Sequence, residues 1–419
     1  MEEMLARLGI TGAQVAVLDG NGLRETAYGT ANAELGLPMT TDTLIQAGST
    51  TKLCTAALAM ILVGEGLLDL DAPVREHLPE LRVAHGDRVT LRHLLSMTAG
   101  IDNGFYDDPA DYLATLSDLE PLFEPGEGYS YSNASTVIAG TLAARRAGTS
   151  WDLALRERVL EPLGLRHSVT LQEELPYHRV AVGHGPDGAV VRPWTFSRAS
   201  GPAGSTLCTT AGDLARFGEA FLRGPVLPAK VRQAMQEPQV TLPTRRFAEQ
   251  WCLGPYRRRL GNLVVHGHSG TNLGGSSTLV WTEDTVVAVI CNSPHAGYPL
   301  AAAVIEEVLG TGFHDVRPDG RPVEDATPYV GFYAACDMRY EVSAAGGELL
   351  LTLRDPASGE AGPPVRLLPL EGDRFLPEQD LSGGRGWDLA FVVRDGRAVR
   401  LVNGAFAARR YERETRSAS

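Results

Sequence analysis

A serine and a lysine three residues apart have the types and the spacing that nucleophilic catalysis needs. Ser49 and Lys52 precede an apolar run from Leu53 to Val63. Residues i and i+3 share a helix face, so the hydroxyl and the amine can meet. Lysine occurs at positions 52 and 230 alone, and the other cations among the 38 Lys plus Arg are arginines. Because a buried lysine can lose its proton and an arginine cannot, Lys52 is a candidate base.

The S-x-x-K pattern is short and has a simpler interpretation, a serine N-cap followed by an exposed lysine in the first helical turn. Two further stretches supply candidate partners. Tyr131 and Asn133 lie in a loop ahead of a helix expected at 134–148, and His268 lies on an expected strand beside Gly270. A strand glycine permits close backbone approach by a ligand. The simpler alternatives are a core aromatic for Tyr131, a helix N-cap for Asn133 and a structural histidine.

Taken together, these stretches resemble a known family. Ser49–Lys52, Tyr131–Asn133 and His268–Gly270 match, in order, the S-x-x-K, Y-x-N and H-x-G motifs of the serine β-lactamase and penicillin-binding protein superfamily. The similarity is to its branch of class C β-lactamases, D-peptidases and related esterases, and it covers about residues 10–310. Each motif is weak alone, whereas their order and spacing make the set specific.

The resemblance implies a catalytic role for four residues. Ser49 would be the nucleophile and Lys52 the base that takes its proton. Tyr131 would relay that proton to the leaving amine, thiol or alcohol. His268 stands where other members have lysine, and it would polarise Tyr131 or bind a carboxylate. An acyl-Ser49 intermediate follows from this assignment.

The resemblance also implies how the substrate is held. Asn133 would donate to a substrate amide carbonyl, and Ser269, Gly270 and Thr271 would lie along the substrate. The backbone N–H groups of Ser49 and Thr271 would form the oxyanion hole. The mechanism requires no cofactor and no metal, and the histidines form no metal-binding pattern.

A competing hydrolase motif spans Gly267 to Thr271. Gly-His-Ser-Gly-Thr nearly matches the G-x-S-x-G elbow of α/β-hydrolases. It departs at the last position, follows no parallel βαβ series, and leaves Ser49 and Lys52 without a role. We therefore rank it below the first assignment.

Hydrophobic periodicity predicts an α+β fold in two parts. Short strands at both ends of residues 1–310 enclose a helical middle, which indicates an antiparallel sheet flanked by helices plus a helical lobe. Residues 311–328 are rich in Pro, Gly and Asp and are expected to be a linker. Residues 329–419 alternate short strands with turns, which predicts a small antiparallel barrel that resembles the lipocalin-like domain of some family members.

Composition limits the partners. The net charge is -13 and no basic stripe is present, which argues against nucleic acid and anionic membranes. No apolar run approaches the ~20 residues that span a bilayer. The N-terminal residues lack the features of a secretory signal, so a cytoplasmic location is expected, and the five scattered cysteines suit reduced thiols there.

The acyl substrate is left open by the sequence. A small molecule or a peptidyl amide, ester or thioester would serve, with a D-configured residue expected from the family. Intracellular relatives include small-ester hydrolases, D-amino-acid peptidases and penicillin-binding-protein-type thioesterases, which release and cyclise nonribosomal peptides from a carrier protein. For such a role Arg409 and Arg410 of the last barrel strand would bind a carboxylate, although solvated arginines are the simpler interpretation. The non-enzyme alternative is an acylated sensor with slow turnover.

Overall fold

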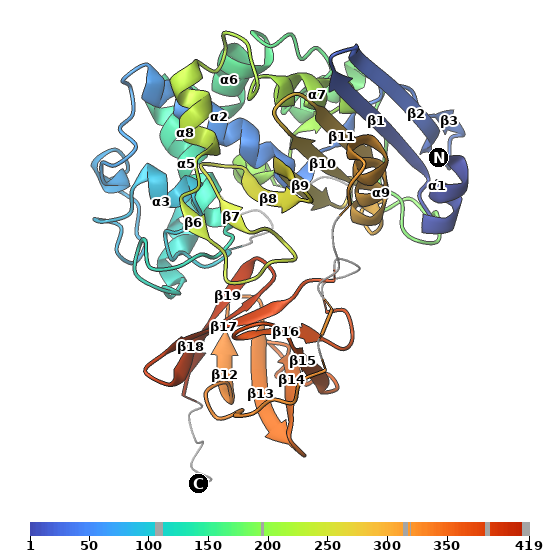
Figure 1. The fold of residues 1–419 in the computed structure, drawn as a ribbon. Coiled ribbons are helices and arrows are strands. Elements are labelled where there is room, and N and C mark those ends of the chain that lie inside the picture. The colour runs from blue at the N-terminus through green and yellow to red at the C-terminus, as the bar shows by residue number, and fades with distance from the viewer. Residues whose placement is uncertain (105–111, 194–196, 313–316, 319, 382–385, 413–419) are drawn as a thin grey trace.

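The computed structural model describes residues 1–104, 112–193, 197–312, 317–318, 320–381 and 386–412. A large part built on one sheet with helices on its faces ends at α9, and a closed barrel follows below it (Figure 1). The predicted fold class, α+β with an appended antiparallel barrel, is confirmed. The described helices include none that is long and apolar enough to cross a membrane.

The large part is organised around a nine-stranded antiparallel sheet in the order β3-β2-β1-β11-β10-β9-β8-β7-β6. Its two central strands, β10 and β11, are buried along their whole length because helices cover both faces of the sheet. The first and last parts of this sheet in the chain are adjacent, because β1 pairs with both β2 and β11. The strands are β1 Gly12–Asp19, β2 Gly22–Asn32, β3 Leu37–Pro38, β6 Val240–Thr241, β7 Gln250–Trp251, β8 Tyr256–Leu260, β9 Leu263–Asn272, β10 Gly275–Trp281 and β11 Val286–Cys291, and a separate pair joins β4 Ile45–Gln46 to β5 Cys208–Thr209.

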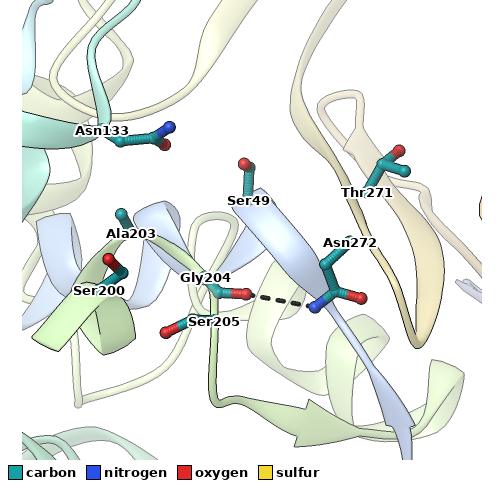
Figure 2. Close-up of a pocket in the computed structure, with 8 residues that line it drawn as sticks. All are labelled: Ser49, Asn133, Ser200, Ala203, Gly204, Ser205, Thr271 and Asn272. Atoms are coloured by element: carbon teal, nitrogen blue, oxygen red, sulfur yellow. Dashed lines mark hydrogen bonds between the residues drawn. The ribbon is translucent and has the colours of Figure 1, made fainter. Parts of the chain in front are cut away.

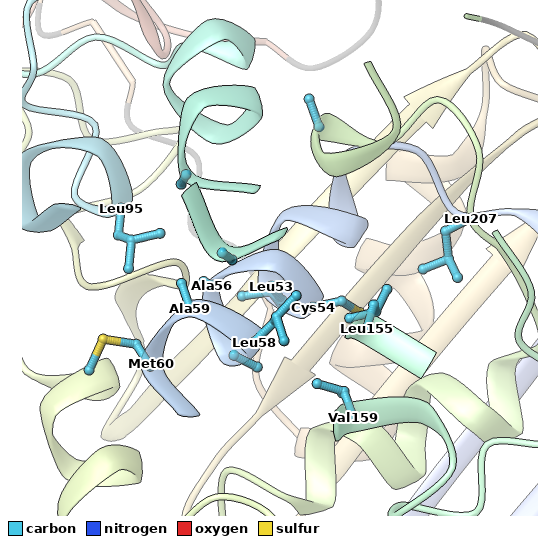
Figure 3. Close-up of a cluster of buried hydrophobic side chains, with 14 of the residues drawn as sticks. Leu53, Cys54, Ala56, Leu58, Ala59, Met60, Leu95, Leu155, Val159 and Leu207 are labelled. Atoms are coloured by element: carbon cyan, nitrogen blue, oxygen red, sulfur yellow. The ribbon is translucent and has the colours of Figure 1, made fainter. Parts of the chain in front are cut away.

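Helix α2 passes through the centre of the larger hydrophobic core. Its residues from Thr51 to Leu62 are all buried, and Leu53, Leu58 and Met60 pack against side chains of the surrounding helices (Figure 3). Burying each such side chain contributes ~1.5–3 kcal/mol, so this core fixes the helix that carries Lys52. The helices are α1 Glu2–Leu8, α2 Thr51–Gly64, α3 Leu91–Leu95, α4 Tyr112–Thr115, α5 Asn133–Ala147, α6 Trp151–Leu155, α7 Ala211–Glu219, α8 Ala229–Gln236 and α9 Gly297–Leu309.

The barrel closes with eight antiparallel strands, each hydrogen-bonded to the next and β12 to β19. Buried residues alternate along β13 and β14, as a half-buried strand requires, and a separate core of apolar side chains fills the interior. The strands are β12 Gly331–Ala334, β13 Arg339–Ala345, β14 Glu348–Arg354, β15 Val365–Pro369, β16 Arg374–Pro377, β17 Leu389–Arg394, β18 Arg397–Asn403 and β19 Phe406–Tyr411.

Hydrophobic periodicity also predicts helices at 89–97 and 151–160, and the structure gives both of them different bounds. The helix expected at 89–97 is the shorter α3, which Thr90 caps through a reciprocal bond with His93. The helix expected at 151–160 turns into a π-helical segment at Arg156. The strand expected to carry His268 is β9, which runs from Leu263 to Asn272 and keeps its pairing with β10 through the glycines at 267 and 270.

Candidate active site

Ser49 lies in the 3₁₀ turn Gly48–Thr50 that leads into α2. Two glycines bring this turn against β9. A Cβ atom on Gly48, whose φ is +60°, would lie 2.6 Å from Thr271 N, and one on Gly270 would lie 2.5 Å from Ser49 N. Such contacts are too short for any side chain, so glycine at both positions lets the backbones of Ser49 and Thr271 approach each other. The close approach suits the expected oxyanion hole.

The amine of Lys52 is buried beside Ser49. Its side chain is 2% exposed, and Nζ lies 3.1 Å from Ser49 Oγ, 2.6 Å from Asn133 Oδ1 and 2.6 Å from Ala203 O. Burial lowers the pKa of Lys52 well below 10.5 because the charged form loses its hydration. In the neutral amine, two N–H groups serve the two carbonyl acceptors and the lone pair is left for the Ser49 hydroxyl. The geometry is that of a base poised at a nucleophile.

Tyr131 packs beside the same amine. Lys52 Nζ lies 4.8 Å from the centroid of the Tyr131 ring, and the ring is edge-on to Trp251 and Phe406. The backbone N–H of Tyr131 donates to Ala405 O of the barrel at 2.8 Å. The residue is thus both a well-packed aromatic and a neighbour of the candidate base, so the two interpretations of Tyr131 are compatible.

Asn133 is the first residue of α5, and Ser132 caps that helix through a bond from Ser135 N to Ser132 Oγ. The interpretation of Asn133 as the N-cap is therefore wrong, and its side chain is available to Lys52. The backbone N–H of Asn133 donates to Asn103 Oδ1 at 2.8 Å. Asn103, which the sequence did not single out, thus holds the start of α5 in place.

His268 is neutral in this environment. The imidazole is 2% exposed, and burial together with the nearby Lys52 lowers its pKa to about 3. Nδ1–H donates to Ser269 O at 2.7 Å, whereas Nε2 has no hydrogen-bond partner among the described residues. The ring lies 6.0 Å from that of Tyr131, centroid to centroid. A neutral imidazole that offers a lone pair suits polarisation of Tyr131 better than the alternative, binding a carboxylate.

Two cavities meet at Ser49. We call the first the polar pocket; it has a volume of ≈ 110 Å³, and Figure 2 shows Ser49 and Asn133 at its edge. It is lined by Ser49, Asn133, Ser200, Ala203, Gly204, Ser205, Thr271 and Asn272. We call the second the aromatic pocket, which has a volume of ≈ 170 Å³. It is lined by Ser49, Tyr131, Asn133, Phe247, His268, Ser269, Thr271, Tyr298, Trp387, Ala405 and Phe406.

The barrel supplies one wall of the aromatic pocket. The turn between β18 and β19 presents Ala405 and Phe406, and Trp387 lies in the loop before β17. Ser130 accepts a bond from Ala407 N through Oγ, beside the bond from Tyr131 N to Ala405 O. These contributions could not be found from the sequence, since hairpin residues such as these occur in any barrel.

A second contact joins the barrel to the start of α5. Cys336 N donates to Asp102 Oδ2 at 2.7 Å and Cys336 Sγ to Asn103 O at 3.1 Å. Asn103 in turn accepts from Asn133 N. The loop at 102–103 therefore links the barrel to a residue that binds Lys52.

The structure does not bring Arg409 or Arg410 to the cavities at Ser49. Arg409 pairs with Glu120. Arg410 stacks over Tyr333 and donates to backbone carbonyl groups, among them that of Ala398. Arg409 forms a solvent-exposed ion pair, which agrees with the simpler interpretation, whereas the guanidinium of Arg410 is held by groups of its own barrel.

The competing elbow motif is not at a strand-to-helix turn. Ser269 lies within β9, opposite Thr278 of β10, and the two hydroxyl groups are 3.1 Å apart. A nucleophile elbow needs the sharp turn that exposes its serine. The geometry therefore favours Ser49 over Ser269 as the nucleophile.

The comparisons with known proteins agree with the motifs. The model of the family described as "Beta-lactamase" matches residues 1–311. Penicillin-binding protein 4 of Amycolatopsis lactamdurans is 34% identical over 355 residues, which cover 77% of this chain and 93% of that protein. Esterase EstB of Burkholderia gladioli is 28% identical over 352 residues, covering 70% of this chain and 90% of the esterase.

Among solved structures, SurE has the same two-part architecture. Its crystal structure superposes with a TM-score of 0.82 at 28% identity and covers 98% of this chain and 97% of SurE. The structure of SurE with D-Leu gives a TM-score of 0.80 at the same identity and coverage. The likeness therefore includes the barrel. With the family model matching well over half of its length, this chain belongs to the beta-lactamase family of serine hydrolases, within the serine β-lactamase and penicillin-binding protein superfamily.

Proposed function

We propose that this protein is a serine acyltransferase that moves a peptidyl chain, ending in a D-configured residue, from an ester or thioester to Ser49 and then to an amine. One observation carries the proposal: Lys52 Nζ, buried and with a lowered pKa, lies 3.1 Å from Ser49 Oγ. A lysine whose pKa is lowered by burial can take the hydroxyl proton as the nucleophile attacks.

The first half-reaction assigns a task to each nearby group. The acyl carbonyl carbon binds Ser49 Oγ, the proton of Ser49 passes to Lys52, and the leaving thiol or alcohol receives a proton through Tyr131. The N–H groups of Ser49 and Thr271 stabilise the oxyanion. Asn133 holds Lys52 and donates to the substrate amide. Neutral His268 polarises Tyr131 for this relay.

The D-configuration and the peptidyl substrate are supported by likeness. SurE, which this chain matches over 98% of its length, was crystallised with D-Leu. The barrel is part of that match, and here it forms a wall of the aromatic pocket. A thioester on a carrier protein would be the donor of a nonribosomal peptide, and cyclisation follows where the attacking amine belongs to the same peptide.

A second candidate is hydrolysis of small esters, which the 28% identity to Esterase EstB supports. Both candidates share acyl-Ser49 and differ in the acceptor, amine or water. The product distinguishes them, since transfer yields a cyclic or linked amide and hydrolysis yields an acid.

The test is intact-mass detection of a covalent adduct with a penicillin, a p-nitrophenyl ester and a peptidyl thioester ending in a D-residue. The proposal expects a transient adduct from the thioester that yields a macrocycle, and no adduct in Ser49→Ala. A stoichiometric adduct that persists would identify a sensor instead, and an adduct retained in Ser49→Ala would refute the nucleophile.

A further inference from the structure

Tyr131 and His268 lie on the side of Ser49 that faces the aromatic pocket. Both residues line that pocket, and neither is among the described residues that line the polar pocket. A proton relay serves the group that leaves the acyl carbon and, by microscopic reversibility, the group that attacks it. The aromatic pocket is therefore the side from which an acceptor reaches acyl-Ser49.

The walls of this pocket suit an apolar group. Phe247, Tyr298, Trp387 and Phe406 are each half-buried and line it. Binding an apolar side chain in such a cavity is favourable, because it removes the partly exposed aromatic rings from water. Trp387 and Phe247 contact each other at 5.3 Å between ring centroids, which joins the barrel to the loop before β7.

The pocket offers no charge to an acceptor. Among the described residues that line it, none is Asp, Glu, Lys or Arg. His268 is buried and its pKa is lowered to about 3, so it adds no positive charge to the wall. A carboxylate in this place would lose its hydration without gaining a cation.

The barrel wall is held firmly. Gly404 O accepts from Thr244 Oγ1 at 2.5 Å, and the Asp388 carboxylate accepts from the backbone N–H groups of Arg245 and Arg246. Asp388 follows Trp387, and Gly404 precedes Ala405 by one residue. Two of the loops that carry the pocket residues are therefore fixed to the large part of the protein by buried hydrogen bonds.

From these observations we propose that the aromatic pocket is the acceptor site, and that it selects a neutral primary amine next to an apolar side chain, with Trp387 and Phe406 as the specificity-determining residues. The inference rests on the proposed acyltransfer and names its acceptor class. The amine nitrogen forms a bond to the acyl carbon, the bond from that carbon to Ser49 Oγ breaks, and the proton lost by the amine returns to Ser49 Oγ through Tyr131 and Lys52.

The experiment measures how acyl-Ser49 divides between amines and water. The donor is the N-acetylcysteamine thioester of N-acetyl-D-leucine, and the acceptors, at equal concentration, are leucinamide, phenylalaninamide, glycinamide and the α-amide of glutamate. Amide and acid products are separated by chromatography and mass spectrometry. We expect the ratio of amide to acid to be at least about tenfold higher for the two apolar amides than for glycinamide, and lowest for the glutamate amide.

Variants of the barrel residues test whether these residues cause the preference for apolar amines. Phe406→Ala and Trp387→Ala should reduce the preference to about threefold or less, and Phe406→Leu should keep most of it. The matched control is Phe332→Ala, a barrel aromatic that packs on Tyr411 instead of the pocket. Retained folding of each variant is checked by its melting temperature.

The outcomes separate the two proposals. If no donor forms an adduct with Ser49, the proposed function fails and the acceptor site with it. If the adduct forms but all amines compete equally, or if Phe406→Ala slows acylation without changing the product ratio, the acceptor assignment alone is refuted. The last result would place the acyl side chain in the aromatic pocket.

Discussion

Replacing Lys52 with arginine puts a permanent cation at the position and removes the base. The amine is 2% exposed, and burial lowers its pKa well below 10.5, whereas a guanidinium stays protonated up to ~12.5 or higher. A positioned general base contributes ~10²–10⁴-fold to rate. We therefore expect Lys52→Arg to slow acylation of Ser49 by about 10³-fold, which corresponds to ~4 kcal/mol of activation free energy.

The assay is the time course of the Ser49 adduct by intact mass at pH 7, with a D-leucine thioester as donor. Lys52→Met is the matched control, because it also lacks the base but introduces no buried charge, and its melting temperature reports folding. Both variants should be slow to a similar degree. A rate for Lys52→Arg within tenfold of the wild type would refute the base assignment. In the wild type the acylation rate should rise with pH around the lowered pKa of Lys52 and stay constant above it. A rate that continues to rise up to pH 10 would contradict the lowered pKa.

Three further changes test the same site. Because burial lowers the pKa of Lys52, the unfolded chain binds more protons than the folded chain at pH values between that lowered pKa and the ordinary one, so stability should rise with pH across this range by at most ~1.4 kcal/mol per pH unit, and Lys52→Met should remove that slope. Denaturant titrations at pH 7 and 9 measure the free energy of unfolding, and equal values at the two pH values would disprove the prediction. Gly270→Ala would place a Cβ atom 2.5 Å from Ser49 N, so we expect ~10²–10³-fold slower acylation; a normal adduct rate would exclude the expected oxyanion geometry. Asn103→Ala removes the acceptor for Asn133 N and should lower kcat with little change in KM and cost ~1–3 kcal/mol of stability. Asn103→Asp, which keeps an oxygen there, should recover part of kcat, and equal losses in both variants would indicate a purely structural role.

The sequence predicted the parts of the site that depend on local patterns. Ser49 and Lys52 meet because they are three residues apart on one helical segment, and the apolar run after them becomes the buried helix α2. The β1–β2 hairpin is predictable for the same reason, since the turn residues Gly20 to Gly22 separate two neighbouring strands. The Y-x-N motif of the family then linked Asn133 to the Ser49–Lys52 pair. In the structure Asn133 Oδ1 lies 2.6 Å from Lys52 Nζ.

The remaining features depend on contacts between distant segments. Asn103 reaches Asn133 across 30 residues, and Cys336 reaches Asp102 across 234, so no local periodicity marks them. Helix α8 was missed because its face carries few apolar residues, with two of its residues buried. The prediction for Arg410 failed because a strand-end arginine gives no sign that the carbonyl groups of its own barrel will accept its hydrogen bonds.

The position of the barrel bears on which reaction follows acylation. An acyl-serine is hydrolysed whenever water reaches it beside a working base, so a transferase must keep its acceptor side dry and open to the acceptor. Phe406 packs edge-on to the Tyr131 ring at 5.5 Å between centroids, next to the relay that would activate either nucleophile. If the wall excludes water, Phe406→Ala should raise the share of acid product above that of the wild type even without an added amine acceptor, when the only competitor of water is an amine within the peptide. An unchanged share of acid would show that the barrel covers the site without choosing between water and amine.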